Sequence, residues 1–203
     1  MIEDGYEKNY ARLALDLPKA DFGARALELG FSPAQDGVKI AFLGREYRLD
    51  PTGVTAVDGL PSSSNHRSLL IHYLFSPGRG GPGETFLTLS QLPGHIRGRQ
   101  DPAADFTHDP ILRAYGDDYP GFRKAAIKLG GEELPAAQDG WRVWVFLVLP
   151  QVKIKLGYCP ADEEFPTEVW TRFDNLALSY LGFECLAFLQ GALSRALADL
   201  KEG

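Results

Sequence analysis

Residues 141–180, WRVWVFLVLPQVKIKLGYCPADEEFPTEVWTRFDNLALSY, contain two strand-like runs that meet at Pro150. The first run, residues 143–149, is apolar at both alternations, which predicts an interior strand covered on both sides. The second run alternates apolar with polar or small residues from 152 to 158, which predicts a strand with one face in water. An acidic cluster and a shorter strand-like run follow. This stretch therefore predicts a sheet whose acidic connection is the first place to look for a site.

Helices and a hairpin are predicted on either side of this stretch. Residues 38–42 and 47–49 alternate like a β-hairpin, which residues 54–57 extend into a three-stranded meander. Residues 181–200 carry an apolar stripe at helical spacing, which predicts a long amphipathic helix. Shorter elements are predicted as helices at residues 4–17, at 21–29 with Asp21 as the cap, after the serines 62–64, after Asp109 and after Tyr119, and as a strand at 85–89.

The order of these elements predicts the fold class. Helices and strands come in clusters and lack the regular alternation of a doubly wound fold. We therefore predict an α+β fold, a mainly antiparallel sheet with helices packed on it and a long C-terminal amphipathic helix. At 203 residues the chain has the length of a single domain, residues 1–203, with room for two lobes. Such a chain buries enough surface to fold without a disulfide or metal.

Composition and charge exclude several classes of protein. The net charge of −6 is unfavourable for binding the phosphates of nucleic acids. No run reaches the roughly 18 apolar residues of a membrane helix, and the N-terminus has no apolar signal core. Two cysteines, Cys159 and Cys185, are too few for a disulfide framework or a cysteine-only metal site. We therefore expect a cytoplasmic protein that binds neither nucleic acid nor membrane and has no cofactor.

The negative charge is concentrated in one segment. Residues 159–185 contain six acids and one base, a balance of −5. Asp162, Glu163 and Glu164, with Asp174, can bind a hard cation such as Mg²⁺ or Ca²⁺, or supply general acid and base carboxylates. Neighbouring residues of an extended turn cannot all face one point, so we predict no metal site.

A solvated turn is the alternative interpretation of this acidic segment. In that case its carboxylates face Lys153 and Lys155 of the preceding strand. Cys159 lies beside the same acids, and negative charge raises the pKa of a thiol, which argues against a nucleophilic cysteine.

His72 is the histidine with a candidate chemical role. It lies in the predicted helix SLLIHYLF, and imidazole exchanges a proton near neutral pH. The alternative is a hydrogen-bonded histidine at a helix–sheet boundary. His66 cannot share a ligand with it, because their spacing places them about 240° apart around the helix. His95 and His108 lie in turn-rich sequence without ligand spacing.

The glycine-rich motif SPGRGGPGE, residues 76–84, does not fit a phosphate loop. Phosphate loops need a helix N-terminus after the glycines, usually with a lysine, whereas a strand-like TFLTL follows here. We predict a connecting loop.

Several short motifs follow one another along the chain in an order that resembles a known family. They are ALELGF, VKIAFLGREYRLDPTGVTAV, SLLIHYLFSPGRGGPGETFLTLSQLPG, KLGGEEL, LPQVKIKLGYCPADEEFP and RFDNLALSYL. With this order and spacing the chain resembles the family called domain of unknown function 3786, found in bacteria and archaea, largely anaerobes. The resemblance implies no characterised activity. Some relatives look like fusions to iron–sulfur modules, which hints at anaerobic redox or cofactor metabolism, but this chain lacks a cluster of cysteines.

We predict an accessory domain that binds a protein partner or a small ligand through the acidic face of residues 159–175. The alternative is an enzyme of unknown reaction in which a carboxylate of Asp162, Glu163 or Glu164 works with His72 at a sheet-end pocket. No catalytic residue is assigned, and substrate and oligomeric state are left open. The candidate binding residues are His72, Asp162, Glu163, Glu164 and Asp174.

Overall fold

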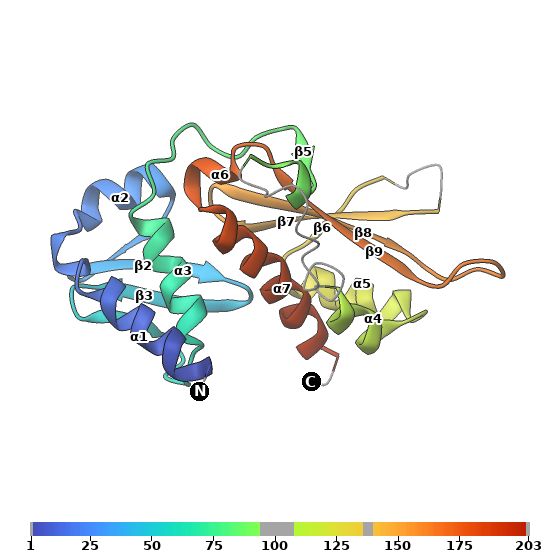
Figure 1. Ribbon diagram of the computed structural model, residues 1–203, viewed down its shortest axis with the longest axis horizontal. Coiled ribbons are helices and arrows are strands. Elements are labelled where there is room, and N and C mark those ends of the chain that lie inside the picture. Colours follow the sequence, from blue (N-terminus) through green and yellow to red (C-terminus); the bar gives the residue numbers. More distant parts are fainter. Residues whose placement is uncertain (1, 94–107, 136–139, 202–203) are drawn as a thin grey trace. The chain divides into compact units, whose positions relative to one another are not determined.

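The computed structural model describes residues 2–93, 108–135 and 140–201 of the chain (Figure 1). In this part the fold is α+β with antiparallel strands and a long C-terminal helix, as predicted, but the strands form two sheets where one sheet was expected. The chain divides into two compact units where the sequence predicts one domain. Unit 1 comprises Met1–Gly81, Leu149–Gln151 and Ser179–Leu181, and unit 2 comprises Pro82–Val148, Val152–Leu178 and Gly182–Gly203.

Unit 1 is a four-stranded antiparallel meander with helices. Its elements are α1 (Ile2–Ala14), a 3₁₀ turn (Leu17–Lys19), α2 (Phe22–Leu29), β1 (Ser32–Ala34), β2 (Gly37–Phe42), β3 (Arg45–Asp50), β4 (Gly53–Ala56) and α3 (Ser64–Leu74).

The predicted hairpin forms because its apolar residues alternate. Ile40 of β2 lies opposite Tyr47 of β3, and both are buried. Leu43 and Gly44 form the two-residue turn, both with positive φ, which suits the twist of a tight hairpin. Asp21 caps α2 by accepting a hydrogen bond from the Ala24 N–H at 3.0 Å, as predicted. β1 is an added strand that the sequence analysis missed.

Unit 2 is built on a five-stranded antiparallel sheet of order β5-β9-β8-β7-β6. Its strands are β5 (Phe86–Leu87), β6 (Glu132–Glu133), β7 (Arg142–Leu149), β8 (Val152–Cys159) and β9 (Glu168–Asp174). The helices are α4 (Asp109–Tyr115), α5 (Tyr119–Lys128) and α7 (Phe183–Asp199), and α6 (Ala177–Tyr180) is divided between the units.

The helices α4, α5 and α7 lie on one side of this sheet (Figure 1). Phe122 of α5 stacks on Tyr158 with ring centroids 4.5 Å apart and meets Trp144 edge-on at 6.2 Å. β7 lies between β6 and β8, so the prediction of an interior strand is confirmed. The prediction that it is covered on both sides is wrong, because Leu147 is 58% exposed on the face away from these helices.

The C-terminal helix is confirmed as α7, and four residues of its predicted apolar stripe are buried: Leu189, Ala192, Leu193 and Leu197. Leu186 and Ser194 are buried, whereas Phe188 and Ala196 are half-buried. In the described part of the chain, no helix is both long and apolar enough to cross a bilayer.

Candidate functional site

The acidic segment forms the loop between β8 and β9, residues 160–167, here called the acidic loop. β8 and β9 are paired from Ile154↔Phe173 to Cys159↔Glu168, and the loop lies at the far end of this hairpin (Figure 1). Asp162 closes the loop: its carboxylate accepts from the Glu164 and Phe165 N–H groups, both at 2.8 Å. These two bonds lower the pKa of Asp162. The loop therefore has a defined conformation.

Glu163 and Glu164 are both exposed in the acidic loop, and Phe165 beside them is 61% exposed. Residues 159–171 contain no Lys or Arg, so no base within this stretch neutralises the two carboxylates. The structure thus presents the Phe165 ring beside two exposed carboxylates, Glu163 and Glu164, that form no salt bridge with any described residue.

A further acid joins this surface from the turn between α4 and α5. The Thr167 hydroxyl donates to the exposed carboxylate of Asp117 at 2.6 Å. Sequence reasoning missed Asp117 because it lies 50 residues before Thr167 and no local pattern links the two. The acidic face, as the structure has it, consists of Asp117, Asp162, Glu163, Glu164 and Glu168.

Cys159 ends β8 at the base of the acidic loop. Burial, followed by the charges of Glu168 and Asp162, raises the pKa of its thiol. The thiolate, which is the reactive form, is therefore disfavoured here, in keeping with the expectation from sequence.

Asp174 lies apart from the acidic loop. It ends β9, which Glu168 begins, so the two are about 20 Å apart along the strand. Its side chain is fully buried and accepts three backbone hydrogen bonds, from the N–H groups of Gly83 at 2.9 Å, Lys153 at 2.8 Å and Leu176 at 3.0 Å. This carboxylate organises the backbone around the start of β8.

The predicted pairing of the acids with two lysines is wrong. Lys155 lies opposite Arg172, and Lys153 lies further still from the loop end of β8. The Lys153 Nζ is 3.9 Å from Glu84, and the Lys155 Nζ lies 4.1 Å from the centroid of the Phe86 ring.

His72 lies in α3 of unit 1 and is exposed, whereas the acidic loop belongs to unit 2. Partial desolvation and then the charge of Arg12 lower the pKa of its imidazole. A neutral imidazole suits a general base, but neither unit by itself contains both partners of the alternative enzyme. That alternative stays a prediction. His95 lies outside the described residues.

His108 belongs to a polar cluster in unit 2 that the sequence analysis missed. Its Nε2 lies 3.2 Å from both the Thr171 Oγ1 and the Gln190 Nε2. The amide nitrogen can only donate, so Nε2 accepts and the ring is held neutral. Burial lowers the pKa of His108, in agreement with this geometry.

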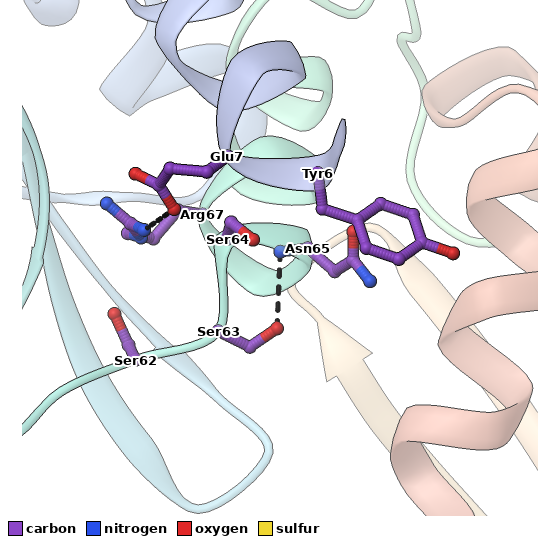
Figure 2. A pocket seen from close by; sticks show the side chains of 7 residues that line it. All are labelled: Tyr6, Glu7, Ser62, Ser63, Ser64, Asn65 and Arg67. Atoms are coloured by element: carbon purple, nitrogen blue, oxygen red, sulfur yellow. Dashed lines mark hydrogen bonds and ion pairs between the residues drawn. The ribbon is translucent and has the colours of Figure 1, made fainter. Parts of the chain in front are cut away.

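Unit 1 has a pocket of about 620 Å³ at the start of α3 (Figure 2). Ser63 caps the helix, as predicted, by accepting from the Asn65 N–H at 3.2 Å. Arg67 pairs with Glu7 at 2.7 Å, and its guanidinium lies 4.0 Å from the centroid of the Tyr10 ring. The residues that line the pocket are Tyr6, Glu7, Ser62, Ser63, Ser64, Asn65 and Arg67. Such a lining can hydrogen-bond a polar ligand.

The glycine-rich segment connects to β5, as predicted. The Gly81 N–H donates to the Tyr180 hydroxyl at 3.0 Å, and the Gly83 N–H is bound to Asp174. Two of its glycine N–H groups are thus engaged within the chain, and a strand follows where a phosphate loop would need a helix. In the ranges that the structure covers, no three His, Cys, Asp or Glu side chains are grouped so that they could hold a metal ion.

Comparison with known proteins places the chain in a family. No curated protein and no solved structure matches it. The family model described as domain of unknown function, DUF3786, matches residues 21–196. This span includes every strand of both sheets and the whole acidic loop. The chain therefore belongs to the DUF3786 family.

Proposed function

We propose that this chain is a cytoplasmic accessory domain that binds a protein partner through its acidic face. The observation that carries the proposal is the acidic loop: Glu163 and Glu164 are exposed beside the largely exposed ring of Phe165, with no base in residues 159–171. Protein–protein interfaces commonly combine an aromatic anchor with a charged rim.

The chemistry of the acidic face defines the kind of partner. Its carboxylates attract a surface rich in Lys and Arg and steer association, while Phe165 gains affinity by entering an apolar depression. Because the carboxylates are exposed, binding weakens as salt screens them.

The ordered loop supports the same proposal. Asp162 uses its charge on the loop's own N–H groups, so Glu163, Glu164 and Phe165 are held in place before a partner arrives. The Thr167–Asp117 hydrogen bond fixes the base of the loop to the α4–α5 turn.

The test immobilises wild type and variants and compares which protein each retains from a lysate of the source cells. Binding of that protein, once purified, is then measured for each immobilised chain. Wild type and the double variant Glu132→Gln/Asp199→Asn, which removes two exposed acids elsewhere in unit 2, should retain the same protein. Glu163→Gln/Glu164→Gln and Phe165→Ala should each weaken its binding, by about tenfold or more for a central aromatic contact. If the acidic-loop variants bind that protein as tightly as wild type, the proposal is wrong.

A further inference from the structure

The β8–β9 hairpin carries charges of opposite sign at its two ends. The loop end holds the acidic face. The other end holds Lys153, Lys155 and Arg172, here called the basic stretch, which the strand alternation places on the face away from α4, α5 and α7. On that face Arg172 lies 4.6 Å from the centroid of the Trp170 ring, and Trp170 contacts Trp141 at 5.8 Å.

Two side chains of the basic stretch, Lys155 and Arg172, have no anionic partner in the part of the chain that the structure describes. Lys155 and Arg172 are directly opposite each other across the strands, and like charges in that position destabilise a sheet. Among the described residues, no carboxylate lies within 4 Å of Lys155 or Arg172, and Lys153 has Glu84 at 3.9 Å. An external anion would relieve this repulsion.

The acidic loop and the basic stretch of one hairpin are too far apart to neutralise each other. Lys155 and Cys159 are four ladder positions apart, so the basic stretch and the loop are separated by about 13 Å or more along rigid paired strands. That exceeds the Debye length of about 8 Å at physiological salt. A second hairpin laid antiparallel on the first would place each acidic loop on the other's basic stretch.

We propose that the partner of the acidic face is a second copy of this chain, bound through its basic stretch. This inference rests on the proposed function and names the partner. The arrangement has two-fold symmetry, because the acidic loop of each copy contacts the basic stretch of the other copy, and two equivalent contacts close the dimer. Phe165 lies within the loop and can pack on the half-exposed Trp170 and Trp141 of the other copy. The exposed Leu147 lies on the same sheet face and adds apolar area.

Charge reversal tests this with the full chain, by sedimentation velocity. Wild type should sediment as two chains at about 0.1 M salt and shift toward one chain at about 1 M, as the Debye length falls from about 10 Å to about 3 Å. Glu163→Lys/Glu164→Lys and Lys155→Glu/Arg172→Glu should each sediment as one chain. An equimolar mixture of the two variants should recover the two-chain species. In the mixed dimer one contact joins the native acidic loop to the native basic stretch, and the other has both signs reversed, so both contacts are attractive. The control Glu132→Lys/Asp199→Lys should behave as wild type.

Two results would overturn the dimer. One is a wild-type chain that stays monomeric at about 100 μM, well above the Kd of a specific interface. The other is a dimer that persists in both reversal variants, or that fails to return in their mixture. The dimer can be absent while wild type binds a different, basic protein that the acidic-loop variants do not bind. In that case the self-association is wrong and the proposed function stands. If the acidic face binds neither a second copy of the chain nor another protein, the dimer and the proposed function are both wrong.

Discussion

The backbone N–H of Gly83 donates to the carboxylate of Asp174, 91 residues further along the chain. The same side chain, fully buried, also accepts from Lys153 and Leu176, so one carboxylate joins the segment before β5, the start of β8 and the end of β9. An acid that the sequence suggests as a ligand thus organises the fold of unit 2.

Removing this carboxylate should destabilise the chain strongly. Asp174→Ala leaves one buried and two part-buried N–H groups without this acceptor, which we expect to cost about 3 kcal/mol of unfolding free energy. Asp174→Asn keeps one oxygen and should cost less. Urea unfolding measures both, with Asp199→Ala, an exposed acid, as the control. Equal stability of Asp174→Ala and wild type would contradict the assigned role.

Gly157 and Trp170 form a matched pair across β8 and β9. A Cβ at position 157 would overlap the Trp170 indole, so Gly157→Ala should destabilise the hairpin by about 1–3 kcal/mol. In the background of Trp170→Ala the same substitution should cost much less, because the overlapping ring is gone. A double-mutant cycle of unfolding free energies measures this coupling, and additive effects would argue against the contact.

The acidic face should control the reactivity of Cys159. The charges of Glu168 and Asp162 contribute to its raised pKa, so Glu168→Gln should increase the thiolate fraction and speed alkylation by about threefold. The rate is best measured in a Cys185→Ser background, although burial already raises the pKa of Cys185 to about 11. Glu132→Gln is the matched control. An unchanged rate in Glu168→Gln would mean that the charge of Glu168 does not contribute to the raised pKa of Cys159.

His108 should make the chain less stable in mild acid. Because burial lowers its pKa in the folded state, the unfolded chain takes up the proton first. Its contribution is therefore complete above the ordinary histidine pKa of about 6.5 and is lost as pH falls from there toward the folded-state pKa. His108→Gln should flatten the dependence of unfolding free energy on pH between about 8 and 5.

His72, whose pKa is also lowered, should contribute part of the slope that remains in His108→Gln, so the slope should be smaller in the double variant. A slope that His108→Gln leaves unchanged would mean that this imidazole stays solvated in the folded chain.

Local patterns predicted much of the fold, because local chemistry decides those elements. Alternation identified β2, β3 and β8, and Asp21 and Ser63 cap helices where sequence preference places them. Residues 159–175 were predicted to form an acidic face, and Asp162, Glu163 and Glu164 are exposed in the loop, whereas Asp174 is buried.

Long-range pairings were beyond these patterns. Asp174 reads as one more acid until the Gly83 backbone is placed beside it, and Asp117 joins the acidic face through a residue 50 positions away. The apolar run of β7 predicted a strand buried on both faces, whereas Leu147 is exposed. Hydrophobicity alone does not say which elements pack on each face of a strand.

The turn that Asp162 makes has a consequence for the thermodynamics of association. A charged segment that is disordered must lose conformational entropy when a partner binds, which costs about 2–5 kcal/mol. In this chain the Glu164 and Phe165 N–H groups are already bound to Asp162, so most of that ordering takes place when the protein folds. Calorimetry should therefore show association without the large unfavourable entropy of coupled folding, and Asp162→Ala should restore that penalty while leaving Glu163, Glu164 and Phe165 in the sequence.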